Sequence, residues 1–287
     1  MEMESLPFEV IAPAGQILGE SASWCARTQM LWWIDIRAPQ VKRWNSATGA
    51  IDVWTMPELC GAVVPTAGEA VVVALRAGIR LLDPRTGTLA PLATLETGHS
   101  EHRLNEAKCD RQGRLWCGSM WDFGKHPTGG LYRVSADLET RKVRSAVGIP
   151  NGIGFSPDGR TMYHADSTSK GIWVHDMAAD GSVSNRRHIG KASFERGIPD
   201  GMCVDTDGNL WVAHVGGRRA VKLSPTGEEL DEIKVPAKWV TSVAFGGPDM
   251  GDLYLVTADD LEQPDRKGGI WRCRPGVTGV ATPLARV

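Results

Sequence analysis

The sequence of 287 residues lacks the features that mark membrane, exported or nucleic-acid-binding proteins. It has no apolar run of membrane-spanning length, and its first residues lack the basic and apolar segments of a signal peptide. The 32 lysine and arginine residues nearly balance 34 aspartate and glutamate residues, for a net charge of −2, and no basic run is interleaved with aromatic residues. We therefore expect a cytoplasmic protein that binds neither nucleic acid nor a membrane.

Motifs of several enzyme classes are also missing. The sequence contains no Gly-x-Ser-x-Gly motif, which argues against an α/β-hydrolase nucleophile. Its glycine pairs at 216–217 and 246–247 follow strand-like runs without opening a helix, which argues against a phosphate-binding loop. The six cysteines show unrelated spacings and no Cys-x-x-Cys pair. This pattern predicts free and mostly buried thiols in a reducing compartment.

The feature that is present is a repeat. Six times a short apolar run is followed by a polar turn and a second apolar run, and the six opening runs are 20–24, 60–64, 105–109, 151–155, 200–204 and 241–245. Their starts lie roughly 40 to 50 residues apart, which is the period of propeller blades. Asp-Gly turns such as 158–159 favour tight hairpins within each repeat. We therefore predict an all-β protein: a six-bladed β-propeller with four antiparallel strands per blade, forming one domain over residues 1–287.

A closed propeller needs its two ends joined. Residues 8–12 read as a short strand ahead of the first repeat, with no blade of their own. We predict that this N-terminal strand supplies the outermost strand of the last blade, in competition with residues 281–287.

Four of the six repeats open on an oxygen-bearing side chain, namely Glu20, Asn105, Asn151 or Asp200. The same phase in each repeat places these side chains around the axis. By strand parity they share a face, here called the upper face, with the loops that follow the second strand of each blade; the turns between the first and second strands lie on the opposite, lower face. Turn formation is an alternative explanation for Asn151 and Asp200, but not for Glu20.

Carboxylates and amide oxygens that converge on an axis form a hard ligand set. They suit a divalent cation such as Ca²⁺, Mg²⁺ or Mn²⁺, with Zn²⁺ and Fe²⁺ as further candidates. A bound cation would also turn the repulsion between two close carboxylates into binding energy. The sequence therefore predicts a site for one divalent metal ion.

Local motifs around these residues resemble a known family. The segments Leu18-Gly-Glu-Ser21, Arg103-Leu-Asn-Glu106, Ile149-Pro-Asn-Gly152 and Ile198-Pro-Asp-Gly-Met202 occur in order and at even spacing. They resemble the senescence marker protein-30 / gluconolactonase / regucalcin family over nearly the whole chain. The resemblance implies a six-bladed propeller with one catalytic divalent cation, which hydrolyses sugar lactones to aldonic acids.

The resemblance also implies roles for single residues. Glu20, Asn151 and Asp200 match the family's three metal ligands, and Arg103 and Asn105 match its substrate-binding Arg-x-Asn. A cation there would polarise the lactone carbonyl and lower the pKa of a bound water from about 15.7 towards 7. Asp200 is then the candidate general base, and Arg103 would hold ring hydroxyls or the developing oxyanion.

The sequence departs from the family pattern at two places. It has Glu106-Ala107 where the family commonly has Asp-Gly, and this change bears on the shape of the substrate pocket. After Met120, where some members carry a sugar-binding glutamate, Asp122 is the nearest acidic candidate and Trp121 a candidate for stacking on the sugar ring. Asp166 and His214 lie in upper-face loops, and we predict that they support the metal ligands.

Other histidines carry weaker predictions. His99 and His102 have a spacing that would bind zinc on a helix, but we predict that they lie in a polar loop. Packing explains His164 and His175. Two alternatives to a sugar lactonase stay open: a hydrolase of the same architecture that acts on another ester, such as an organophosphate or aromatic lactone, and a non-catalytic calcium-binding propeller. We expect a monomer or weak oligomer.

Overall fold

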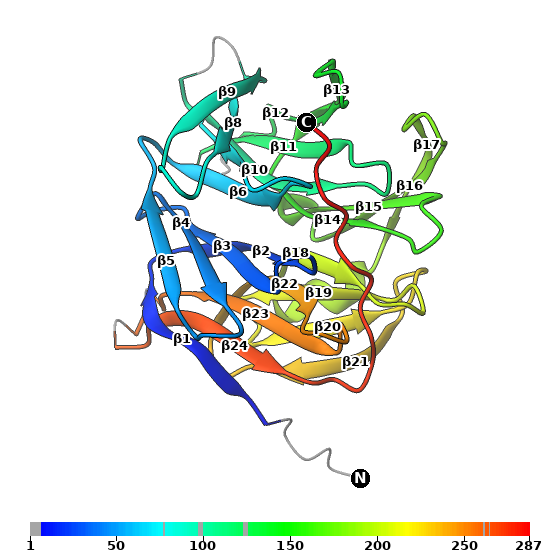
Figure 1. Cartoon of the computed structure of the whole chain (residues 1–287). Coiled ribbons are helices and arrows are strands. Elements are labelled where there is room, and N and C mark those ends of the chain that lie inside the picture. The colour runs from blue at the N-terminus through cyan, green and yellow to red at the C-terminus, as the bar shows by residue number, and fades with distance from the viewer. Residues whose placement is uncertain (1–6, 77, 97–99, 123–125, 261, 264) are drawn as a thin grey trace.

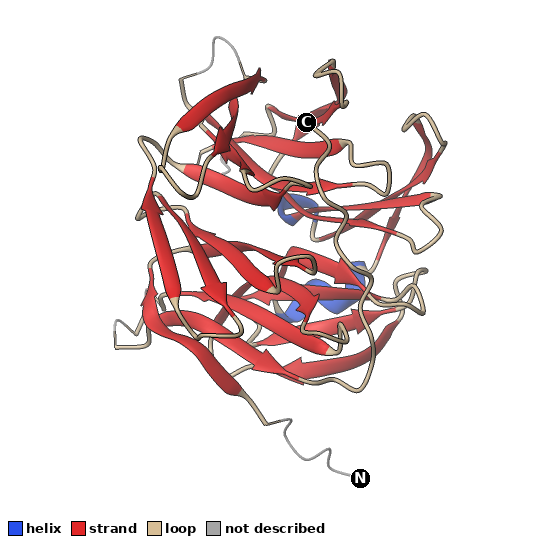
Figure 2. Cartoon of the chain, in the orientation of Figure 1, coloured by secondary structure: helices blue, strands red, loops and turns tan. Residues whose placement is uncertain are grey.

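The structure is a computed structural model that describes residues 7–76, 78–96, 100–122, 126–260, 262–263 and 265–287. The described residues form strands and connecting turns almost throughout (Figure 2). Their only helical segments are two short 3₁₀ turns, η1 (Ser167–Ser169) and η2 (Lys191–Arg196). Within these ranges, no helix has the length and apolar character needed to cross a membrane.

Four sheets contain four antiparallel strands each, paired in chain order. The first sheet consists of β2 (Gly19–Cys25), β3 (Met30–Asp35), β4 (Gln40–Asn45) and β5 (Ile51–Thr55). The second consists of β6 (Cys60–Pro65), β7 (Val71–Leu75), β8 (Gly78–Leu82) and β9 (Leu89–Thr94). The third consists of β10 (His102–Cys109), β11 (Leu115–Trp121), β12 (Gly129–Val134) and β13 (Thr140–Val147). The fourth consists of β14 (Pro150–Phe155), β15 (Thr161–Asp166), β16 (Gly171–Met177) and β17 (Val183–Ile189).

The remaining eight strands form one larger sheet that has two parts. One part is β18 (Ile198–Val204), β19 (Leu210–Val215), β20 (Arg219–Leu223) and β21 (Glu229–Lys234). The other part is β22 (Trp239–Gly246), β23 (Asp252–Ala258), β24 (Gly268–Cys273) and β1 (Glu9–Gln16). A single pairing between Val215 and Trp239 joins β19 to β22 and so links the two parts.

The strand that opens each repeat lies at the inside of the molecule. In chain order β2 contacts β6, β6 contacts β10, β10 contacts β14, β14 contacts β18 and β18 contacts β22, and β22 contacts β2 again. These contacts close a ring, and Figure 1 shows the sheets following one another around the molecule. The ring brings together residues from all six repeats.

The two ends of the chain meet the sheets differently. As predicted, the N-terminal strand completes the last set of strands, because β1 pairs with β24; it extends over Glu9–Gln16, beyond the predicted 8–12. Residues 281–287 form no ladder and instead run across the lower ends of other sheets, as the red trace in Figure 1 shows. The Ala285 amide donates to Pro65 O at 2.9 Å, and the Arg286 amide donates to Gly113 O at 3.0 Å.

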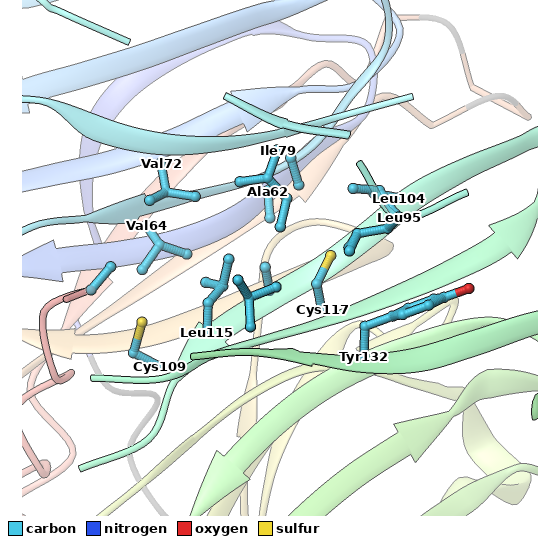
Figure 3. Packing of buried hydrophobic residues seen from close by; sticks show 14 residues of the cluster. Ala62, Val64, Val72, Ile79, Leu95, Leu104, Cys109, Leu115, Cys117 and Tyr132 are labelled. Atoms are coloured by element: carbon cyan, nitrogen blue, oxygen red, sulfur yellow. The ribbon is translucent and has the colours of Figure 1, made fainter. Parts of the chain in front are cut away.

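Apolar side chains fill the space between neighbouring sheets. Figure 3 shows the cluster between the second and third sheets, where Val64, Val72 and Ile79 face Leu104 and Leu115. Burying each such aliphatic side chain stabilises the fold by roughly 1.5 to 3 kcal/mol. The prediction of free cysteines is confirmed: the six thiols are unpaired and five of them are buried. Burial raises the pKa of the Cys60 thiol to about 12, consistent with a packing role.

Aspartates hold the turns on the lower face, and both carboxylate oxygens of each accept hydrogen bonds. Asp205 accepts hydrogen bonds from the backbone amides of Asp207 and Asn209 and, at 3.1 Å, from the indole Nε1 of Trp211. Asp110 repeats the arrangement in the third sheet, with Trp116 Nε1 at 3.0 Å. These carboxylates have the turn-forming role that the sequence pattern predicts.

Candidate metal and substrate site

A repeated irregularity of the inner strands positions the opening residues. Each inner strand breaks its pairing register at the residue predicted to face the axis. In β2 the break lies between Glu20 and Ser23, and in β14 between Asn151 and Ile153. A bulge of this kind bends the strand and changes the direction of the side chains within it. The positive φ of Ser21 (57°) and Gly152 (29°) belongs to two of these breaks.

The two asparagines of the predicted site lie in contact. Asn105 Nδ2 donates to Asn151 Oδ1 at 2.6 Å and to Pro150 O at 2.8 Å. Asn151 Nδ2 in turn donates to Ser167 Oγ at 2.9 Å, and Ser167 Oγ donates to Pro199 O at 2.7 Å. This chain of hydrogen bonds orients Asn151 so that its amide oxygen keeps a second lone pair for another ligand.

The two carboxyl groups of the predicted site, Glu20 and Asp200, are buried and electrostatically coupled. Burial, the neighbouring Asp200 and then Glu106 raise the pKa of Glu20 well above its usual range. Burial and Glu106 do the same to the pKa of Asp200. Asp200 Oδ1 is buried and has no hydrogen-bond partner among the described residues. An ionised carboxylate in this position is costly without a positive charge beside it.

This arrangement fits a divalent cation. Its donors are two carboxylates and an oriented amide oxygen, and one carboxylate oxygen has no partner among the described residues. A cation would counter the burial and the neighbouring negative charges that raise both pKa values. The described residues contain no group of three or more His, Cys, Asp or Glu side chains placed to bind a metal. The candidate site differs from such groups because an asparagine supplies one of its three donors.

Arg103 links the asparagines to a second group of charges. Its Nη1 donates to the side-chain oxygen of Asn105, and its Nε donates to Asp122 Oδ1 at 2.9 Å. Arg37, from the β3–β4 loop, donates to both oxygens of Asp122 at 3.1 and 3.2 Å. The contact between these loops agrees with the strand parity that placed both on the upper face. Burial of Asp122 acts to raise its pKa, but the hydrogen bonds from Arg37 and Arg103 outweigh it and lower that pKa.

Trp121 and Asp166 are each the last residue of a strand, β11 and β15, and each has contacts of its own. Trp121 ends β11 and packs edge-on against His102 and His126, with ring centroids 6.0 and 5.1 Å away. Asp166 accepts the backbone amides of Gly148, Ile149 and Thr168, all at 3.1 Å. Asp166 therefore orders the turn that carries Ser167, and a role in supporting the metal ligands stays a prediction.

Two histidines lie in strands. His214 is fully buried, at 0% exposure, near the end of β19 and opposite Pro199, and support of the metal ligands by His214 stays a prediction. Burial, with the nearby cations of Arg219 and Arg196, lowers its pKa to about 3. His102 begins strand β10 instead of lying in a loop, and its ring nitrogens contact Glu96 Oε2 (3.1 Å) and Thr128 Oγ1 (2.9 Å). His99 and residues 123–125 lie outside the described residues.

Three functional candidates were missed by the sequence reasoning. Ser167 orients Asn151, Glu106 contributes to the raised pKa values of both site carboxyls, and Arg76 lies near Asp122. Ser167 follows the predicted Asp166 and Glu106 follows Asn105, so adjacency was the available signal for both. Arg76 had no such signal, because its repeat opens on Cys60 without a hard ligand.

Comparisons with known proteins identify the family. Residues 18–259 match the family model described as SMP-30/Gluconolactonase/LRE-like region. The chain is 34% identical over 275 residues to 6-deoxy-6-sulfogluconolactonase of Pseudomonas putida, covering 93% of this chain and 94% of that protein. It is 35% identical over 292 residues to L-arabinolactonase of Azospirillum brasilense, covering 95% and 96%.

A solved structure gives the same result. The crystal structure of regucalcin from Agrobacterium tumefaciens, described as a calcium-binding protein, superposes with a TM-score of 0.93 at 25% identity and covers 99% of this chain and 98% of that one. The family match spans most of the chain, and two relatives exceed 30% identity over nearly their full length. This chain belongs to the SMP-30/gluconolactonase/LRE-like family.

Proposed function

We propose that the protein is a metal-dependent hydrolase that opens sugar lactones to aldonic acids. The observation that carries this proposal is an oxygen of Asp200 that has no hydrogen-bond partner in the described part of the chain and is buried beside Glu20, the asparagines and Arg103. The names of two relatives, 6-deoxy-6-sulfogluconolactonase and L-arabinolactonase, describe lactonases and support the same reaction.

The architecture we propose is a six-bladed propeller that forms one domain over residues 1–287. Four blades are the four-stranded sheets, and the eight-stranded sheet supplies two more because only the pairing of Val215 with Trp239 joins its halves. The ring of contacts between inner strands supports this interpretation. The axis of such a propeller passes through the candidate site.

Glu20, Asn151 and Asp200 would hold one divalent cation. When bound, it would polarise the lactone carbonyl and acidify a water molecule. Ca²⁺ is our first candidate, because the three donors are all oxygens and the regucalcin structure is described as that of a calcium-binding protein. Zn²⁺, Mg²⁺, Mn²⁺ and Fe²⁺ are the other candidates.

The protein's own side chains would then share the work of hydrolysis. Asp200, one oxygen of which has no partner among the residues that the structure describes, would accept the proton of the attacking water and return it to the ring oxygen as the ester bond breaks. Arg103 would donate hydrogen bonds to the oxyanion or to a ring hydroxyl. Asn105 would fix both Arg103 and Asn151, since it contacts each.

The buried Arg103 favours catalysis over a non-catalytic calcium site. Burying a guanidinium is costly, and here the arginine approaches the asparagine that contacts the proposed metal ligand. A calcium scaffold has no use for a cation at that position. The concentration of guanidinium groups at this face also disfavours an aromatic lactone, which offers few partners for them.

The test is a panel of aldono-1,4- and 1,5-lactones, assayed with metal-stripped protein reconstituted with Ca²⁺, Zn²⁺, Mg²⁺, Mn²⁺ or Fe²⁺. We expect no turnover without metal and turnover with at least one of these ions. Glu20→Gln should lose activity in the same assay while keeping its circular dichroism spectrum. Turnover by metal-stripped protein, or by Glu20→Gln at the normal rate, would refute the metal-dependent mechanism.

A further inference from the structure

Three arginines from three different sheets surround one carboxylate on the upper face. The guanidinium cluster consists of Arg37 from the β3–β4 loop, Arg76 from the β7–β8 loop and Arg103 from β10, all around Asp122. Arg103 and Arg37 hydrogen-bond to Asp122, whereas Arg76 Nη2 lies 3.8 Å from Asp122 Oδ2. One aspartate thus faces three cations that are drawn together from separate repeats.

Arg76 and Arg103 keep donors that this network does not use. Arg76 is held by a hydrogen bond from Nη1 to Ser100 O at 2.8 Å. Its only ion pair within the described ranges is the 3.8 Å contact, which is too long for a hydrogen bond. Arg103 uses Nε and Nη1, while its Nη2 donates to none of the described residues. Both guanidiniums therefore have N–H groups to offer to a ligand.

The cluster also has a graded exposure. The Arg103 side chain is 6% exposed, and those of Arg37 and Arg76 are 29% and 33% exposed. The cations thus lead from the buried asparagines towards solvent. Repulsion among three positive groups is costly in a partly buried place, and the charges of Asp122 and, for Arg103, Glu20 act against it. A further anion bound by the cluster would lower the repulsion again.

Building on the proposed lactonase function, we propose that the outer part of the guanidinium cluster, with Arg76 as its main donor, binds an oxyanion substituent at the end of the substrate remote from the lactone carbonyl, while Arg103 contacts the sugar ring between the two ends. The substrate is then an aldonolactone with a terminal phosphate, sulfonate or carboxylate. Guanidinium groups bind such oxyanions through paired, charge-assisted hydrogen bonds. Contacts from Asn151 through Asn105 to Arg103 connect the reacting end of the site to the anion-binding end.

In this arrangement Asp122 is a positioning residue. Its two oxygens accept hydrogen bonds from Arg37 and Arg103 and hold these guanidiniums in place. Arg76 is the residue that most directly tests the proposal, because its charge has no hydrogen-bonded carboxylate within the described part of the chain.

The experiment measures binding and turnover separately. Calorimetry compares an aldonate whose far end is uncharged, called the neutral aldonate below because its one charge is the carboxylate common to all these ligands, with aldonates that carry an additional terminal phosphate, sulfonate or carboxylate. The proteins are wild type, Arg76→Gln and Arg76→Lys. Turnover of the corresponding lactones gives the ratio of kcat/KM for anionic over neutral substrate. Arg85→Gln is the matched control, since Arg85 is an exposed arginine of the same sheet, paired with Asp83 in the turn between β8 and β9.

We expect at least one of the three oxyanions to be preferred over the neutral compound. Arg76→Gln should reduce that preference by roughly 10- to 100-fold, the factor that one charge-assisted hydrogen bond contributes. Arg76→Lys should keep part of the preference, and Arg85→Gln all of it. The oxyanion with the largest preference identifies the substituent.

Two results would overturn the inference: equal or better binding of the neutral aldonate by wild-type protein, or an unchanged preference in Arg76→Gln. A merely structural role of Arg76 would weaken neutral and anionic ligands alike and leave their ratio unchanged. If anionic aldonates bind with the expected preference but no lactone is opened, the proposed hydrolysis fails while the anion site stands.

Discussion

Asp200 lies near the start of the inner strand β18 and Asp205 directly follows its end, and their carboxylates have different surroundings. Both are buried, at 6% and 0% exposure. Asp205 receives hydrogen bonds from two backbone amides, Asn209 Nδ2 and an indole, and its carboxylate lies 3.4 Å from Lys222. Asp200 has an oxygen with no hydrogen-bond partner within the described ranges, and its pKa is raised by burial and Glu106.

The comparison shows how one residue type acquires two roles from its surroundings. At the lower end the chain surrounds the carboxylate with its own donors, so the group stabilises a turn. At the upper end the chain places carboxyl groups against each other and leaves an oxygen unsatisfied, which stabilises nothing unless a cation arrives. At the upper end the carboxylates therefore serve to bind a ligand rather than to stabilise the fold.

Replacing each of the two aspartates by asparagine should give the largest effects, on kcat for Asp200 and on the free energy of unfolding for Asp205. Asp200→Asn should lower lactonase kcat by about 10³-fold or more through loss of the base, without destabilising the metal-free protein, because a repulsive charge is removed. Asp205→Asn should lower the free energy of unfolding by about 2 to 3 kcal/mol through broken hydrogen bonds and retain activity. Lactone kinetics and urea unfolding in chelator measure the two effects. The reverse pattern would show that the roles have been assigned to the wrong ends.

Metal addition sharpens the same contrast. A cation bound only by the folded state at 100 times its Kd stabilises by about 2.7 kcal/mol. We expect this gain for wild-type protein and for Asp205→Asn, and almost none for Glu20→Gln, which lacks one charged donor. Urea titrations with and without the preferred ion provide the measurement. Equal stabilisation of Glu20→Gln would place the ion elsewhere.

His164 tests whether an unpartnered buried group signals function by itself. Both of its ring nitrogens lack partners in the described residues, and burial lowers its pKa from 6.5 to about 4, with Asp166 opposing and His175 adding to the shift. The unfolded chain therefore binds more protons between these values, so stability is complete above pH 6.5 and falls as the pH decreases towards 4. The loss amounts to about 3 kcal/mol.

His164→Phe should remove that part of the pH dependence and leave lactone turnover nearly unchanged. Chemical unfolding of wild-type protein and variant between pH 7 and 4 gives the difference. A large loss of turnover in His164→Phe would mean that the unpartnered histidine belongs to the site, and that the contrast between the two ends of β18 is too simple.

The smallest expected effect concerns the lower turn alone. Trp211→Phe removes the indole donor to Asp205 and should cost about 1 to 2 kcal/mol, partly from the lost hydrogen bond. Activity should not change. Thermal unfolding measures the first effect and lactone kinetics the second; a drop in kcat would reveal coupling between the two faces through β18.

The sequence was sufficient to place the residues that repeat in phase. Glu20, Asn105, Asn151 and Asp200 share a position in their repeats, and a bulge in each inner strand brings them towards one another. The N-terminal strand followed from the same reasoning, because a run without a blade needs a partner. The positions of these residues and of the N-terminal strand follow from the alternation and the period of the repeats, which a single sequence shows.

Residues outside the repeat were harder to predict. Arg76 joins the upper-face charges through a loop whose path depends on the neighbouring sheets, and no pattern in its own repeat indicates it. Asp122 was predicted to contact the sugar; its oxygens are engaged by arginines, and a contact with substrate stays a prediction. His214 was predicted to support the metal ligands; the packing of β19 against β18 encloses it, and that role stays a prediction.

The C-terminal segment that crosses the lower face has a consequence for how the ring opens. The Val280 amide bonds to Val204 O on β18, and the Ala285 amide bonds to Pro65 O at the end of β6, so these few residues tie together sheets that are far apart in the sequence. Separating β1 from β24 would leave this second tie in place. The amide hydrogens of Val280 and Ala285 therefore exchange with solvent only when the C-terminal segment separates from these sheets. Their exchange rates report on how often the ring of sheets opens.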